Sequence, residues 1–294
     1  MARLNSSMLY GAVADVPRVI KDDATGEYKR AAFHIAVVKD DRNTGLDDKT
    51  EIQINYPLIV TQDPDQVRLI SKLKMNDIVE LEGMFVTRKV QKLSHCKFCG
   101  HQNVVEGNFC YVRPIAMKKR NTTDNTEKQA IQMVIDNKAF SNKLLMLGNV
   151  CSEVKFHKGE KYDSCVYQVG SDRKFFIKED DPDTRSDYPI INTYGAQARK
   201  DVLALKKSSL VYIDGYLRSK EFSRKTVCSS EACKKEYQWK DNVMDIIAYD
   251  VQYCSNYDDP EEKKKQLEQQ KAEERAKTTE EFFGTKRPAA PPQE

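Results

Sequence analysis

Residues 210–222 read LVYIDGYLRSKEF, and this stretch decides the fold. Apolar residues fill its first half, Gly215 lies at its middle, and basic residues crowd its second half. Because a residue without a Cβ tolerates the kink of a strand that coils or bulges, the stretch is predicted to be a bent β-strand. Residues 78–90, IVELEGMFVTRKV, repeat the pattern with Gly83 at the centre. A strand with a central glycine and a basic end favours a small closed barrel with a positive face.

The elements around these two stretches repeat as well. Three strands and a short helix are predicted before residues 78–90, and a cysteine-bearing loop and a fifth strand after them. The same order returns between residues 143 and 253, and an internal repeat of this length is the strongest organisational signal in the chain. Five strands with one helix between the third and the fourth is the order of an OB-fold, a small Greek-key barrel. The chain is therefore predicted to be mainly β, with two tandem five-stranded OB-fold barrels, each with a short helix and a cysteine-bearing insertion between its fourth and fifth strands.

The repeat divides the 294 residues into four segments. We expect a first barrel over residues 1–120, a linker over 121–142, a second barrel over 143–257, and a charged helix with a disordered tail over 258–294. The net charge is only +3, so an argument for a nucleic-acid partner must use the position of the charges. No apolar run approaches the roughly 20 residues needed to span a bilayer. The sequence favours a soluble, cytoplasmic protein with no membrane partner.

OB-fold barrels bind single strands when bases stack on aromatic rings and lysine or arginine follows the phosphates. The side chains predicted to do this are Tyr56, Phe85, Arg88, Lys89, Tyr188, Tyr194, Tyr216, Arg218, Lys220 and Phe222. The alternative is that the rings fill barrel cores and the charges only solvate the surface. Phe222 lies among charged residues in RSKEF, which favours an exposed ring.

Two stretches of the second unit carry a resemblance to a known family. VYIDGYLRSKEF (residues 211–222) resembles the fourth strand of bacterial-type single-stranded DNA-binding proteins, and YPIINTYGAQARKDVLALKKSS (residues 188–209) resembles their third strand and helix. The first unit resembles the family more loosely. The tail ends in PPQE, where the family ends in a short Asp-Ile-Pro-Phe-like tip.

The resemblance implies which aromatic residues stack on bases. Tyr188, Tyr194 and Phe222 match the family's stacking positions, and Tyr56 is their match in the first unit. Val90 stands where the second unit has Phe222, which implies a weaker platform in the first unit. The resemblance also implies that two chains would form a homodimer and so supply the family's usual four barrels.

The first cysteine loop has the spacing of a metal knuckle. Cys96 and Cys99 are separated by two residues and followed by Gly100-His101, and two such thiolates can bind one Zn²⁺ from a tight turn. We expect one structural zinc per chain, bound by Cys96, Cys99, Cys110 and His101, with His95 as the alternative fourth ligand. A pair of free surface thiols is the other reading.

The second cysteine loop has only Cys228 and Cys233, and alignment of the loops puts Met244 opposite the third cysteine of the first. A second site is therefore expected to be degenerate, or to recruit a ligand from elsewhere.

The leading functional hypothesis is a non-catalytic protein that coats single-stranded DNA in replication, recombination or transfer. The sequence contains neither a phosphate-cradling GxxxxGK[ST] loop nor an HExxH motif, so no enzyme activity is expected. The alternative is a zinc-bearing OB-fold scaffold that bridges replication or conjugation proteins, with the charged helix at residues 261–277 as the docking element. A zinc nuclease is a third reading, resting on the acidic run at residues 179–183.

Overall fold

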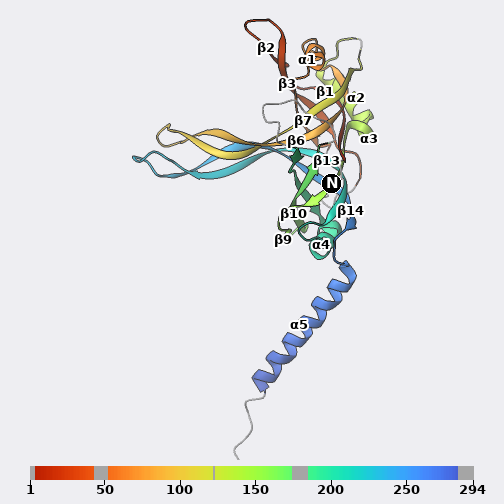
Figure 1. Cartoon of the computed structure of the whole chain (residues 1–294), viewed down its shortest axis with the longest axis vertical. Helices are drawn as coiled ribbons and strands as arrows, with labels where there is room; N and C mark the ends of the chain where they lie inside the picture. The colour runs from red at the N-terminus through yellow and green to blue at the C-terminus, as the bar shows by residue number, and fades with distance from the viewer. Residues whose placement is uncertain (1–3, 43–51, 122, 174–184, 284–294) are drawn as a thin grey trace, which may run out of the picture.

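The structure is a computed structural model, and it describes residues 4–42, 52–121, 123–173 and 185–283 (Figure 1). The first half contains β1 (Leu4–Val13), β2 (Arg18–Lys21), β3 (Tyr28–Val38), β4 (Ile54–Asn55), β5 (Leu58–Thr61), α1 (Pro64–Ile70), β6 (Ile78–His95) and β7 (Gln102–Lys119). The helices α2 (Glu127–Asp136) and α3 (Lys138–Ser141) connect the halves. The second half contains β8 (Asn142–Val150), β9 (Lys155–His157), β10 (Ser164–Asp172), β11 (Ser186–Asp187), β12 (Ile190–Tyr194), α4 (Gly195–Ala204), β13 (Leu210–Val227), β14 (Glu236–Ser255) and α5 (Pro260–Phe283).

Each half closes into a five-stranded barrel. In the first barrel, β1 pairs with β3 and β6, β6 pairs with β7, β7 pairs in parallel with β5, and β5 returns to β3. In the second barrel, β8, β10, β12, β14 and β13 close in the same way, again with one parallel pair, β12 with β14. The predicted mainly β fold with two five-stranded OB-type barrels is confirmed.

One strand pair joins the barrels into a continuous sheet. β1 and β8 run antiparallel, with Leu4 opposite Leu147 and Leu9 opposite Asn142. An asparagine at each end ties this seam to the neighbouring strand. Asn5 exchanges two hydrogen bonds of 2.8 and 2.9 Å with the backbone of Phe85, and Asn142 exchanges two of 2.8 and 3.0 Å with the backbone of Leu217. The two halves therefore face each other across an approximate two-fold relation.

The predicted bends lie at the predicted glycines. The ladder of each long hairpin shifts register at this point, between Glu82 and Gly83 in one and between Asp214 and Gly215 in the other. A Cβ on Gly215 would lie 2.3 Å from the carbonyl oxygen of Ile247, far inside van der Waals contact. Glycine is required here because the neighbouring strand passes too close for any side chain.

The cysteine-bearing segments, expected as loops, are extensions of the barrel strands. β6 and β7 stay paired from the barrel out to His95 opposite Gln102, and β13 and β14 stay paired out to Val227 opposite Glu236. The resulting hairpins project side by side from the junction of the barrels (Figure 1). We call residues 87–110 arm 1 and residues 219–242 arm 2.

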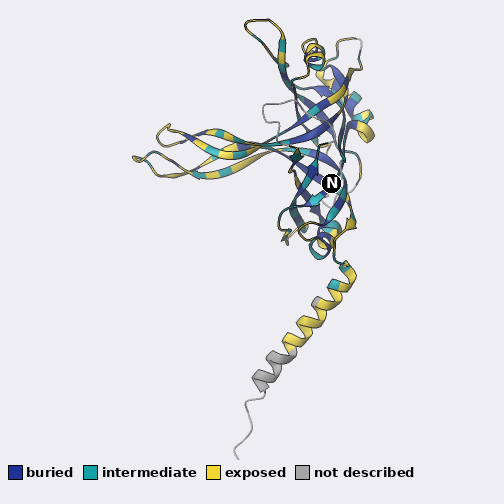
Figure 2. Cartoon of the chain, viewed as in Figure 1, coloured by how far each residue is buried: buried dark blue, intermediate teal, exposed yellow. Residues whose placement is uncertain are grey.

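The charged C-terminal helix is present as predicted. α5 extends away from the second barrel, and nearly all of its described side chains are exposed (Figure 2). The predicted disordered end, residues 284–294, and the acidic run at 179–183 lie outside the described residues. No helix in the described part of the chain is both long and apolar enough to cross a membrane.

Candidate nucleic-acid interface and cysteine cluster

A groove lies where arm 1 meets the second barrel. Its volume is about 670 Å³. The backbone N–H of Tyr188 donates to Oγ1 of Thr87 at 2.7 Å, so the tyrosine is fixed against the base of arm 1. We call this the Tyr188 groove; it is lined by Thr87, Arg88, Lys89 and Asn108 of arm 1 and by Cys151, Gln168, Ser186 and Tyr188 of the second barrel.

An equivalent groove lies where arm 2 meets the first barrel. Here the N–H of Tyr56 donates to Oγ of Ser219 at 3.1 Å, which repeats the tyrosine-to-hydroxyl contact of the other side. The volume of this groove is about 450 Å³. We call it the Tyr56 groove; it is lined by His34, Tyr56, Leu58, Phe109 and Cys110 of the first half and by Ser219, Lys220, Glu221, Asn242, Val243 and Met244 of the second.

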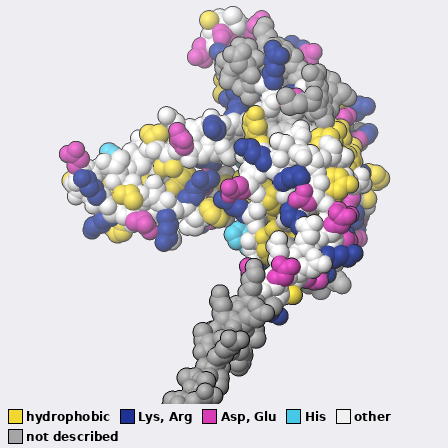
Figure 3. Space-filling model, turned by 60° about the horizontal axis from the view of Figure 1, so that its bottom comes forward, with side chains coloured by type: hydrophobic (Ala, Val, Ile, Leu, Met, Phe, Trp, Pro, Cys, Tyr) yellow, Lys and Arg dark blue, Asp and Glu magenta, His cyan; other side chains and the backbone are white. Residues whose placement is uncertain are grey.

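Each groove is thus composite, with a tyrosine from one barrel and polar or charged side chains from the arm of the other. Figure 3 shows dark blue lysine and arginine side chains on the arms and where the arms meet the body. A ring beside a cation on an open surface can stack on a base while the cation contacts a phosphate. The geometry is that of a surface able to hold a single nucleic-acid strand.

Three of the predicted aromatic residues are exposed. Tyr56, Tyr188 and Phe222 expose 47%, 49% and 50% of their surfaces, so their rings are accessible to a base. Their contact with DNA stays a prediction, as it does for Arg88, Lys89 and Lys220.

The structure corrects the prediction for the other three rings. Phe85 and Tyr216 are fully buried and Tyr194 is 8% exposed, so none of them offers a free face to a base. Tyr194 instead packs edge-on against Tyr162. Its hydroxyl accepts a 3.0 Å hydrogen bond from Arg218. Desolvation by these surroundings raises the pKa of the Tyr194 hydroxyl.

Arg218 is also placed differently from the prediction. Its guanidinium donates two hydrogen bonds, of 2.9 and 2.7 Å, to the carboxylate of Asp245, and both side chains are largely buried. Lys220 contacts the same carboxylate at 2.9 Å but remains exposed. The bidentate pair engages Arg218 inside the protein, so Lys220 is the cation that reaches the Tyr56 groove.

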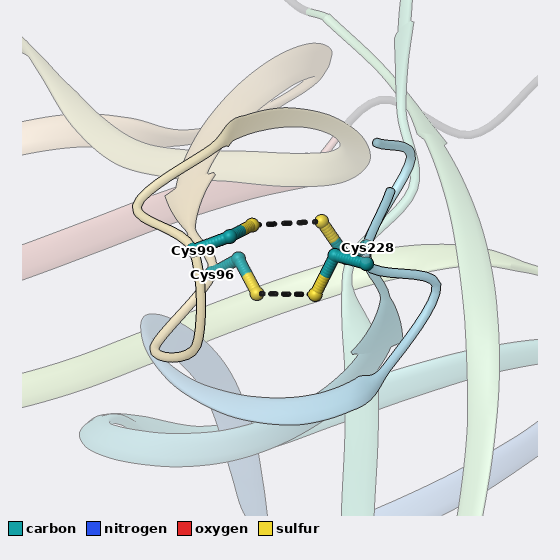
Figure 4. Close-up of side chains that lie close together, drawn as sticks. Cys96, Cys99 and Cys228 are labelled. Carbon is teal, nitrogen blue, oxygen red and sulfur yellow. Dashed lines mark hydrogen bonds between the residues drawn. The ribbon is translucent and has the colours of Figure 1, made fainter. Parts of the chain in front are cut away.

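The tips of the arms bring four cysteines together. The sulfur atoms of Cys96, Cys99, Cys228 and Cys233 all lie within 4.8 Å of one another. Cys96 is 3.8 Å from Cys233 and Cys99 is 3.6 Å from Cys228, and Figure 4 shows the labelled side chains meeting from the two facing arms. A zinc ion bonded to sulfur at about 2.3 Å in a tetrahedron separates its ligands by about 3.8 Å. The donor set and its spacing therefore fit a tetrahedral metal ion, and the distances are too long for disulfides.

A comparison with protein families finds a match in the second half of the chain. Residues 141–243 match the sequence profile described as "Single-strand binding protein family". Over these residues the chain is similar to the single-strand binding protein family. The resemblance inferred from residues 188–222 is thereby confirmed.

Solved structures resemble the whole arrangement of two barrels. The wild-type single-stranded DNA binding protein from Thermus aquaticus superposes with a TM-score of 0.54 at 11% identity, covering 87% of this chain and 95% of that one. A deletion mutant of the same protein gives a TM-score of 0.55 at 12% identity, covering 87% and 97%. At this identity the likeness shows the fold alone. No curated protein sequence matches the chain.

The members of the cysteine cluster differ from the predicted ligand set. Cys110, in β7, lies opposite Thr87 in the ladder and lines the Tyr56 groove, where burial raises the pKa of its thiol to about 12. Nε2 of His101 lies 3.1 Å from Oγ of Ser229 and takes no part in the cluster. The places expected for these two residues are taken by Cys228 and Cys233 from the second half of the chain.

A signal for this pairing was present in the sequence. Cys228 follows Cys96 by 132 positions, the interval that also separates Gly215 from Gly83. Equivalent positions in two units related by a two-fold axis approach each other when they lie near the axis. The two cysteine loops are therefore halves of one site, which reasoning on each loop alone could not find.

The local backbone positions the sulfur atoms of Cys96 and Cys99 and changes the pKa of their thiols. Gly100, at φ 72°, donates its N–H to the carbonyl of Cys96 at 2.9 Å and closes a tight turn. Although desolvation raises it, the pKa of the Cys96 thiol falls to about 7 because the N–H groups of Phe98 and Cys99 donate to its sulfur. The pKa of Cys99 rises to about 12 despite a backbone hydrogen bond, because of desolvation and the neighbouring sulfurs. Without a cation the cluster disfavours a second thiolate.

Further contacts cross-link the arms below the cysteines. The hydroxyl of the buried Tyr237 lies 2.7 Å from Oγ of Ser94 and accepts a 2.7 Å hydrogen bond from Asn103. Lys92 of arm 1 contacts Asp241 of arm 2 at 2.5 Å, and Asp241 is 4% exposed. The arms form one cross-bonded unit that ends in the cysteine cluster.

Proposed function

We propose that this chain binds single-stranded DNA without catalysing a reaction, and that it coats intermediates of replication, recombination or transfer. The observation that carries the proposal is the pair of composite grooves. In each groove one exposed tyrosine is held against the start of the opposite arm, where at least one lysine lines the groove. The family match of residues 141–243 and the name of the similar Thermus aquaticus protein support the same function.

The groove geometry gives each residue a role. Bases stack on the exposed faces of Tyr188 and Tyr56, and Phe222 offers a further ring on arm 2. Each stacked base contributes about 1–3 kcal/mol, without demanding a particular sequence. Arg88 and Lys89 contact phosphates in one groove and Lys220 does so in the other, so affinity falls as salt rises.

Binding of labelled oligo-dT, followed by fluorescence anisotropy, tests the proposal. Tyr188→Ala combined with Tyr56→Ala should weaken binding of a long oligonucleotide by at least about 25-fold, since each ring contributes about 5-fold or more. Phe140→Ala is the matched control, because this ring is 72% exposed but lies on α3, outside both grooves. Equal affinity of the double variant and the control, or equal affinity of the wild type for duplex DNA, would contradict single-strand binding through the grooves.

We further propose that the four-cysteine cluster holds one structural Zn²⁺ per chain. When bound, zinc would supply four metal–sulfur bonds that tie arm 1 to arm 2. The closed set of four sulfurs leaves no ligand position for water, which is typical of a structural and not a catalytic zinc site. Measurement of one equivalent of zinc in the purified chain, released by a thiol-reactive mercurial, is the expected result.

The domain division, the oligomeric state and the role of α5 form a separate, directly testable part of the proposal. We propose the domain division 1–120, 121–142, 143–257 and 258–294, and a homodimer that brings four barrels together, to be measured by light scattering. The exposed α5 is proposed to recruit replication or recombination proteins, so deletion after residue 258 should spare DNA binding and abolish recruitment. Since the single-stranded DNA that the chain is proposed to coat is an intracellular intermediate, we propose that the protein is cytoplasmic.

A further inference from the structure

A third hollow adjoins the Tyr188 groove on the arms. Its volume is about 460 Å³, and we call it the arm cleft. It shares Lys89 and Asn108 with the Tyr188 groove, so the two form one continuous surface from the second barrel onto the arms. The arm cleft is lined by Lys89, Val90, Gln91, Glu106, Gly107 and Asn108 of arm 1 and by Arg224 of arm 2.

The charges of the two tyrosine grooves differ at equivalent positions. With the interval that relates Gly83 to Gly215, Arg88 corresponds to Lys220 and Lys89 corresponds to Glu221. The Tyr188 groove therefore has two adjacent cations where the Tyr56 groove has a cation and a carboxylate.

Ion pairs act on both sides of this difference. Glu221 contacts Lys240 at 2.7 Å, and the arm cleft has one carboxylate of its own, Glu106. In the Tyr56 groove, Lys220 lies 2.9 Å from Asp245, which reduces the charge that it offers to a phosphate. Lys89, by contrast, is exposed, and within the part of the chain that the structure describes it has no carboxylate partner. In the arm cleft Arg224 adds a cation that keeps a third of its side chain exposed while contacting Asp241 at 2.7 Å. The Tyr188 groove and the arm cleft together have three cationic side chains and one carboxylate, against one lysine and one carboxylate in the Tyr56 groove, so the Tyr188 side is the more cationic one.

We propose that the two grooves are unequal, and that the Tyr188 groove with the arm cleft is the entry site for the strand. This inference rests on the proposed single-strand binding. The first nucleotides stack on Tyr188, and their phosphodiester backbone runs past Lys89 towards Arg224 on the arms. The Tyr56 groove is filled later, by strands long enough to reach it.

Short and long oligo-dT separate the two grooves in the full-length chain. A strand of about 10 nucleotides lies within the 4–16 that one OB fold covers, so it can occupy only one groove. On this strand Tyr188→Ala should weaken binding about 10-fold or more, and at least five times as much as Tyr56→Ala. On a strand several times longer, the two substitutions should have similar effects.

A charge exchange at equivalent positions tests the electrostatic part. Lys89→Glu should weaken binding of the short strand at least about 10-fold and lower the salt dependence, because each phosphate contact contributes about 0.7 to the slope of log K against log salt. Glu221→Lys should tighten binding and make the effects of Tyr56→Ala and Tyr188→Ala nearly equal. Both side chains are exposed, and thermal unfolding of each variant checks that the fold is intact.

Two outcomes are distinguished. If the wild type binds neither short nor long single strands at low salt, the proposed function itself fails. If it binds both, but the two tyrosine variants weaken the short strand equally, or Lys89→Glu leaves its affinity unchanged, the grooves are equivalent and only the entry-site inference is overturned.

Discussion

Replacing Cys233 by serine should remove the metal from the protein, whereas replacing Cys110 by serine should leave it bound. The reason is geometric: Cys233 lies 3.8 Å from Cys96, the edge of a zinc–sulfur tetrahedron, whereas Cys110 lies outside the cluster. The two substitutions are chemically identical, and both thiols are partly buried. The pair therefore distinguishes a site shared by the arms from a site built by the first loop alone.

The size of the effect follows from linkage. A structural zinc site typically binds with about 10–16 kcal/mol, and a dissociation constant of about 1 nM corresponds to about 12 kcal/mol. At free zinc 1,000 times that constant, binding stabilises the closed arms by about 4 kcal/mol. Loss of one sulfur ligand should remove most of this. The barrels should keep their stability, because the cluster lies at the arm tips and the barrel cores close without it.

Zinc content and limited trypsin digestion measure the two parts of the prediction. Lys97, Lys234 and Lys235 are exposed at the tips, and cleavage beside them should accelerate at least about 10-fold in Cys233→Ser but not in Cys110→Ser. Hydrogen bonds of Tyr237 still cross-link the arms below the tips, so cleavage should stay at the tips. If Cys110→Ser lost the zinc and Cys233→Ser kept it, the shared site would be refuted.

Two further substitutions test the fold and the arms. Gly215→Ala should lower the free energy of unfolding in urea by about 1–3 kcal/mol or more, since its Cβ would lie 2.3 Å from the Ile247 carbonyl oxygen; unchanged stability would refute the close approach. Asp241→Ala leaves Lys92 without its buried partner, so hydrogen exchange in the arms should quicken by the equivalent of about 2 kcal/mol. Asp65→Ala is the control: it removes an exposed ion pair and should change exchange by under about 0.5 kcal/mol.

The barrel order could be predicted because its signals are local. Gly83 and Gly215 indicate the bends of residues 78–90 and 210–222. The helix between the third and fourth strands is indicated by the spacing of its apolar residues and by Pro64 at its start. Two copies of the same order confirm each other, so the fold follows even though each single element is ambiguous. The exposure of Phe222 was predictable for a similar reason, because its neighbours are charged.

Whether the rings of Phe85, Tyr194 and Tyr216 point into the barrels or towards solvent could not be predicted. In β6 and β13 burial alternates up to Gly83 and Gly215, but directly after these glycines successive residues are all buried, so alternation no longer separates the inside from the outside there. A one-residue change of register moves a ring to the other face. Tyr216 directly follows the glycine where its strand shifts register, and Phe85 lies two residues after the other such glycine. Tyr194 was expected to stack on a base only through the sequence resemblance, but the ring is 8% exposed and its hydroxyl accepts a hydrogen bond from Arg218.

That Cys96 and Cys99 belong to a cysteine cluster could be predicted, whereas its other two members could not. Two cysteines at knuckle spacing indicate a metal whatever the fold, so Cys96 and Cys99 are where they were expected. The other two ligands depend on where a loop more than a hundred residues away lies, which no local pattern contains. His101 is closer to Cys96 and Cys99 in sequence, but the two-fold relation between the arms makes Cys228 and Cys233 closer in space.

The strand seam between β1 and β8 has an evolutionary consequence. A protein assembled from identical subunits must carry any substitution on both sides of its symmetry axis at once. Here both sides are encoded separately within one polypeptide, so each can acquire its own residues. Lysine at position 89 and glutamate at position 221 are such a divergence. Substitutions in one half can therefore change how the Tyr188 groove binds a strand while the Tyr56 groove stays unchanged.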